Sequence, residues 1–79
     1  MRKLKNIISK VLGVDKEEIN EKSSPENIES WDSFNGLLLI SEIEDKYKIK
    51  FTANEVINMR KVEDIKKALI KRGVKTNQL

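Results

Sequence analysis

The sequence contains no cysteine and no histidine, and it has only one proline, three glycines and one tryptophan. The missing cysteines exclude disulfide bridges, thiolate zinc sites and a thiol nucleophile. The missing histidines remove the usual general base and the commonest metal ligand, so a self-contained catalytic triad is excluded and we expect neither a catalytic nor a metal site. The longest apolar run, Leu37 to Ile40, is far shorter than the roughly 20 residues of a membrane span, and the N-terminal segment has no signal-peptide core. We therefore expect a soluble, cytoplasmic protein.

Charge is strongly segregated along the 79 residues, which are enough for one small domain. Residues 1–14 carry a net charge of +4, residues 15–45 carry −8 and residues 46–79 carry +7. A nucleic-acid interface would be a continuous basic face with arginine or aromatic readers, but arginine supplies only three of the 16 cations. We therefore expect no nucleic-acid partner.

Apolar spacing predicts an all-α fold, a small four-helix bundle of three main helices and a short third one. Apolar residues at helical intervals indicate helices over about 2–12, 33–48, 53–59 and 62–72, with a frayed tail over 74–79. Thr52 and Glu55 have the spacing of a capping box at the start of the short helix, and Gly73 is a stop for the last one. The predicted core comprises Leu4, Ile7, Ile8, Val11, Leu39, Ile43, Tyr47, Ile65 and Leu69.

A long loop separates the first two predicted helices, over about residues 14–32. A structureless connection of that length is unusual in a small domain, so we expect local turns within it. Val14, Ile19 and Ile28 are the apolar residues that can anchor it to the helices.

Four consecutive apolar residues of the second predicted helix cannot all face one core. At about 100° per residue, Leu39, Ile43 and Tyr47 form the core stripe, whereas Phe34, Leu37 and Leu38 lie on the other side. Two interpretations stay open. Either the long loop, with Ile28 and Trp31, covers these side chains, or they form an exposed patch for a partner or cargo.

Ser33 stands at the start of the same helix, where unpaired backbone N–H groups and the helix dipole favour a negative charge. A phosphate attached there would be stabilised. Ser33 could instead be a plain helix cap, which is the commoner role of an isolated serine in this position. Asp32 can cap the same helix, however, so Ser33 is not needed for that role.

Four segments together resemble the acyl carrier protein family, whose small helical members carry a thioester cargo on a 4′-phosphopantetheine arm attached to a serine. They are Val11–Val14, Trp31–Phe34, Ile40–Phe51 and Val62–Ile65. The resemblance places the arm on Ser33, preceded by the acidic Asp32. It implies a non-catalytic monomer whose partners are a phosphopantetheinyl transferase, an acyl- or aminoacyl-loading enzyme and a downstream acyltransferase or synthase.

We further predict that partners bind a mixed surface around Ser33, in which apolar contacts contribute more than charge. Its predicted residues are Phe34, Leu37, Leu38, Ser41, Glu44, Asp45 and Arg60.

The sequence departs from the typical fatty-acid carrier, whose second helix is rich in acidic residues. Here Asn35, Leu38 and Ser41 occupy that face, and Trp31 precedes the Asp-Ser pair. These features are similar to carriers of specialised biosynthetic or modification pathways. A fatty-acid synthesis carrier and an unmodified helical adaptor remain the alternatives.

Overall fold

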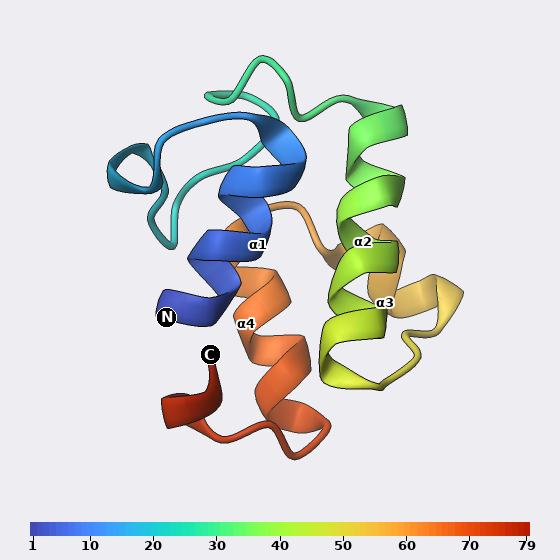
Figure 1. The fold of residues 1–79 in the computed structure, drawn as a ribbon. Helices are drawn as coiled ribbons and strands as arrows, with labels where there is room; N and C mark the ends of the chain where they lie inside the picture. Colours follow the sequence, from blue (N-terminus) through green and yellow to red (C-terminus); the bar gives the residue numbers. More distant parts are fainter.

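The computed structural model describes residues 1–79 and contains four α-helices and no strand (Figure 1). The helices are α1 (Arg2–Leu12), α2 (Ser33–Tyr47), α3 (Ala53–Asn58) and α4 (Val62–Lys71), and short 3₁₀ turns span Lys16–Glu18 and Thr76–Gln78. This confirms the predicted all-α bundle with a short third helix. None of the four helices combines the length and the apolar character that crossing a bilayer requires.

The helices form a bundle of about 29 × 26 × 20 Å in which α2 runs beside α1 and the short α3 lies next to the second half of α2 (Figure 1). Both chain termini lie at one end of this bundle, and α2 begins at the other end. The long loop between α1 and α2 therefore lies at the end where α2 begins.

The core lies between α1, α2 and α4. Seven of the nine predicted core residues are buried, but Val11 and Tyr47 are only partly buried and pack against its edge. Leu12 takes the buried position on α1 in place of Val11, and the hydroxyl of Tyr47 donates to the carbonyl oxygen of Gln78 at 3.3 Å, which keeps its polar end at the surface. The buried apolar residues are Leu4, Ile7, Ile8, Leu12, Ile19, Ile28, Trp31, Leu39, Ile43, Val62, Ile65, Leu69 and Leu79.

The long loop is an integral part of the bundle. Ile19 and Ile28 are buried and Val14 packs partly buried against the core, as predicted. The carbonyl oxygens of Glu21 and Ser23 accept hydrogen bonds from the N–H groups of Glu63 and Val62, at 2.9 and 3.0 Å. These bonds supply the acceptors that the first turn of α4 needs, because no side chain caps that helix.

The C-terminal residues contradict the predicted frayed tail. Leu79 is buried in the core, and its carbonyl oxygen accepts a hydrogen bond of 2.5 Å from the N–H group of Leu4. No side chain caps α1, so the last residue supplies an acceptor for its first turn. The reversal that brings the chain back is made by Gly73 at φ 96°, a left-handed conformation that glycine adopts without strain.

Candidate functional site

Ser33 is the first residue of α2, and Asp32 is its cap. The carboxylate of Asp32 accepts a hydrogen bond from the N–H group of Asn35 at 2.8 Å, and the side-chain amide of Asn35 donates to the carbonyl oxygen of Ser30 at 2.8 Å. The side chain of Ser33 is exposed and is not needed for capping. The N–H groups of Ser33 and Phe34 have no acceptor within the chain. An anion attached to the hydroxyl of Ser33 would therefore lie against free N–H donors and the positive end of the helix dipole.

The other serines are differently placed. Most of them have hydroxyls engaged with the backbone, as with Ser9 on Val14 and Ser30 on Leu12. Ser41 is exposed, but it lies in the interior of α2, where the backbone N–H groups are used by the helix. Ser33 thus combines a free hydroxyl with an open helix N-terminus. The engaged serines are Ser9, Ser23, Ser24 and Ser30.

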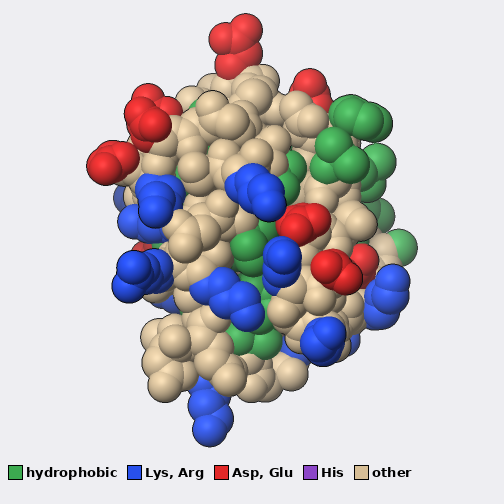
Figure 2. Space-filling model, viewed as in Figure 1, with side chains coloured by type: hydrophobic (Ala, Val, Ile, Leu, Met, Phe, Trp, Pro, Cys, Tyr) green, Lys and Arg blue, Asp and Glu red, His purple; other side chains and the backbone are tan.

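The apolar patch, which we define as Phe34, Leu37 and Leu38, is exposed. These side chains retain 69%, 64% and 45% of their accessible surface, and Figure 2 shows hydrophobic side chains gathered at the upper right, over the first half of α2. The interpretation that the loop covers them is wrong, because they remain exposed while Ile28 and Trp31 pack into the core. An open apolar surface next to an exposed serine is suited to contact with another molecule.

A groove of about 440 Å³ opens beside Ser33. Its walls come from the end of the long loop, from α2 and from the α3 region, and they are mostly apolar. Asp32 is the only ionisable side chain that lines it. The residues that line the groove together with Ser33 include Trp31, Asp32, Gly36, Leu37, Val56 and Met59.

The remaining predicted residues lie apart from this groove. Ser41, Glu44 and Asp45 line a separate depression further along α2. Glu44 also has a structural role, because its carboxylate accepts a hydrogen bond of 2.8 Å from the N–H group of Phe51 and so fixes the connection to α3. Arg60 is exposed between α3 and α4, next to Met59 of the groove, but lines neither depression.

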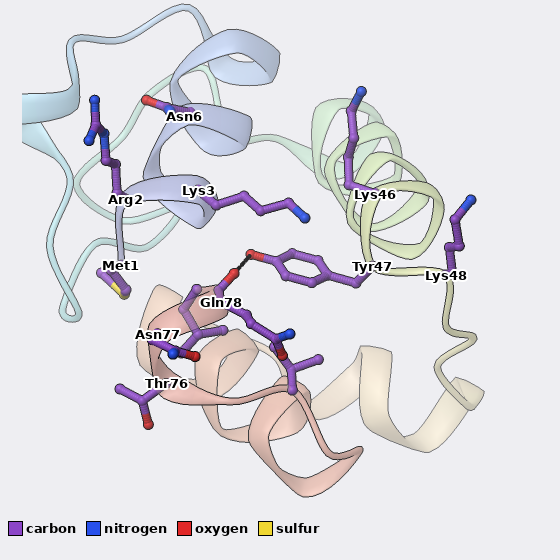
Figure 3. Close-up of a pocket in the computed structure, with 12 residues that line it drawn as sticks. Met1, Arg2, Lys3, Asn6, Lys46, Tyr47, Lys48, Thr76, Asn77 and Gln78 are labelled. Carbon is purple, nitrogen blue, oxygen red and sulfur yellow. Dashed lines mark hydrogen bonds between the residues drawn. The ribbon is translucent and has the colours of Figure 1, made fainter.

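A second concave surface, the basic cleft, lies at the end where the termini meet (Figure 3). It measures about 640 Å³ and contains none of the predicted site residues. The ammonium group of Lys3 lies 4.6 Å from the centre of the Tyr47 ring. The other cationic side chains that line the basic cleft are those of Arg2, Lys46 and Lys48.

The groups with shifted pKa values also lie outside the groove. A hydrogen bond from Arg72, helped by one from the backbone of Thr52, lowers the pKa of Glu55 to about 2. A hydrogen bond from Lys67 lowers the pKa of Glu63, and burial raises the pKa of Tyr47. The one ionisable side chain of the groove, the carboxylate of Asp32, accepts the capping hydrogen bond from the N–H group of Asn35.

The sequence prediction missed the walls of the groove. From the sequence, Trp31 is a mark of the family resemblance and a possible cover for the apolar patch, whereas Gly36, Val56 and Met59 are not singled out. A tryptophan directly before a polar helix start was the available signal, since large aromatic side chains usually pack rather than remain in solvent. The contribution of Val56 and Met59 depends on where α3 packs, which local spacing does not define.

Comparison with family models gives one match: residues 2–69 match the model described as phosphopantetheine attachment site. The matched range includes Ser33 and all four helices to within two residues of the end of α4. A comparison with curated protein sequences gave no match.

Proposed function

The chain belongs to the phosphopantetheine attachment family, and from that premise we propose that Ser33 is the residue that bears the arm. Members of this family are carriers that hold 4′-phosphopantetheine covalently. The observation that supports Ser33 is its exposed, unbonded hydroxyl at the open N-terminus of α2, beside an apolar groove. The other serines lack either the free hydroxyl or the open helix end.

In the proposed modification, the hydroxyl oxygen of Ser33 attacks the phosphorus of coenzyme A that bears the pantetheine. A transferase accepts the hydroxyl proton, the new P–O bond forms, and the adenosine bisphosphate half of coenzyme A leaves. The free N–H groups of Ser33 and Phe34 then stabilise the phosphodiester charge. When bound, the arm supplies a terminal thiol that holds cargo as a thioester, a group that this cysteine-free chain cannot provide itself.

Intact mass after incubation with coenzyme A and a broad-specificity phosphopantetheinyl transferase tests this assignment. We expect one arm on the wild-type chain and none on Ser33→Ala. That variant should fold normally, because Asp32 still caps α2. Ser41→Ala is the matched control, since it removes an exposed hydroxyl from the same helix and should be labelled in full. Labelling of Ser33→Ala would contradict the assignment.

The cargo is an acyl or aminoacyl group used in a specialised biosynthetic or modification pathway. What supports this is the surface of α2, which presents the apolar patch where the typical fatty-acid carrier is acidic. In this proposal the loading enzyme and the downstream acyltransferase or synthase contact the apolar patch first. Asp45 and Ser41 lie further along the same helix and form a polar margin.

The exposed apolar patch also supports a second candidate, a helical adaptor that binds a partner without being modified. The same mass measurement separates the two functions, because an adaptor would gain no arm.

A further inference from the structure

Trp31 forms one wall of the groove beside Ser33, and its side chain is almost completely buried, with 6% of its surface exposed. Its indole ring packs on α2 at Gly36. A Cβ atom added to Gly36 would lie 3.4 Å from Nε1 of Trp31 and 3.6 Å from Cδ1, so the indole nitrogen lies directly at the helix surface where Gly36 leaves room.

The indole N–H of Trp31 has no acceptor within the chain. Every fully enclosed side-chain nitrogen or oxygen in the structure has a hydrogen-bond partner, so the indole nitrogen is not enclosed. Trp31 lines the groove, so an unbonded N–H that keeps accessible surface can be reached from it. A tryptophan N–H is a donor only, and in buried tryptophans it is usually bonded. An unused donor therefore stands in an otherwise apolar groove.

We propose that the groove seats the first part of the arm on Ser33 and that the indole N–H of Trp31 donates a hydrogen bond to one of its amide carbonyls. This inference rests on the proposed function, because it requires the arm to be attached there. Past its phosphate, the arm is a neutral chain of alkyl groups, one hydroxyl and two amides. Apolar walls with one donor match that chemistry. An anionic ligand would not match, since no cation lines the groove and Asp32 does.

Gly36 has a defined part in this arrangement. Gly36 has no side chain, so no side-chain atom of this residue covers Nε1 of Trp31. A methyl group at this position would lie in van der Waals contact with the indole nitrogen and would cover it on that side, so Gly36→Ala should hinder the bond to the arm. Alanine is also favoured over glycine within a helix, and this variant should fold.

The single tryptophan makes the test direct, because a ¹⁵N-labelled chain gives one indole N–H resonance. We expect this proton resonance to move downfield when the arm is attached, and its exchange with water to slow several-fold. Gly36→Ala that carries the arm, as checked by intact mass, should show a smaller change. Ser33→Asp supplies negative charge without an arm, and the indole resonance in this variant should stay close to its position in the unmodified chain.

The outcomes separate the two proposals. A chain that gains the arm while its indole resonance and exchange rate stay unchanged overturns this inference and leaves the proposed function standing. A change of equal size in Ser33→Asp would assign the effect to phosphate charge and also overturns the inference. Failure to gain any arm overturns the proposed function and this inference together.

Discussion

The two ends of the bundle differ in how far their polar groups are hydrogen-bonded and their apolar side chains are buried. At the end where the termini meet, Leu79 is buried, its carbonyl oxygen accepts from Leu4, and the hydroxyl of Tyr47 donates to Gln78. At the end where α2 begins, the hydroxyl of Ser33 and two backbone N–H groups have no partner within the chain. The apolar patch next to them is exposed.

Charge differs between the ends as well. The loop over residues 13–32 carries seven acidic side chains and two lysines. Figure 2 shows acidic side chains along the upper edge of the molecule, whereas basic side chains predominate lower down, with a few acidic ones among them. Unsatisfied groups and exposed apolar surface do not stabilise an isolated fold. Their concentration at one end indicates that the end with Ser33 is adapted to contact other molecules and that the end with the termini stabilises the bundle.

The largest expected difference between the two ends is in stability, when one leucine at each end is replaced by alanine. Leu4 is fully buried at the end with the termini, so Leu4→Ala should lower the free energy of unfolding by about 2–5 kcal/mol. Leu37 is exposed beside Ser33, so Leu37→Ala should change the free energy of unfolding by less than about 0.5 kcal/mol. Urea unfolding of both variants measures the contrast. Similar losses in the two would mean that the apolar patch contributes to the core.

A smaller effect is expected on partner binding. Leu38→Glu should weaken affinity for the enzyme that loads the cargo by about 1–3 kcal/mol, because it places a charge in the apolar patch. Ile70 on α4 is the matched control, since it is 44% exposed and Leu38 is 45% exposed. Ile70→Glu should leave the affinity unchanged. Calorimetric titration gives both values, and the docking proposal fails if Leu38→Glu lowers stability while the folded fraction binds normally.

Local patterns predicted the helices, but not how distant segments would meet. The period of Leu4, Ile7 and Ile8 predicts α1, and the wheel of α2 places the apolar patch away from the core stripe, as the structure confirms. Asp32 and Ser33 were likewise placed at the start of α2 from sequence. The position of Leu79 involves the N–H donor of Leu4 in α1, more than seventy residues away in the chain, to which its carbonyl oxygen is bonded. The groove beside Ser33 similarly depends on where α3 packs against α2.

Glu44 is a second case in which the sequence pattern did not predict a contact between separate segments. An acidic residue on a helix surface was predicted to bind partners, because sequence alone does not reveal that the N–H group of Phe51 returns to within 2.8 Å of its carboxylate. Partner contact by Glu44 stays a prediction. Its hydrogen bond to Phe51 means that any substitution there must be checked for stability before it is interpreted as a binding effect.

The smallest expected effect is a pH dependence that distinguishes paired from unpaired acidic residues. Arg72 and Thr52 hold the pKa of Glu55 at about 2, below its ordinary value of 4.5. Because the folded state favours the ionised form, this stabilisation is fully present above pH 4.5 and is lost as the pH falls towards 2. The melting temperature of Glu55→Gln should therefore lie below that of the wild type at pH 6 and approach it at pH 2.

Glu17 is the matched control for this measurement, because it is exposed in the loop that follows α1 and makes no ion pair. Glu17→Gln should shift the melting temperature by a similar small amount at both pH values. High salt should reduce the effect of Glu55→Gln at pH 6, since the pair with Arg72 is accessible to solvent and is screened. A Glu55→Gln deficit that persists at pH 2 would show that its hydrogen-bonded geometry, rather than its charge, stabilises the contact between the start of α3 and the end of α4.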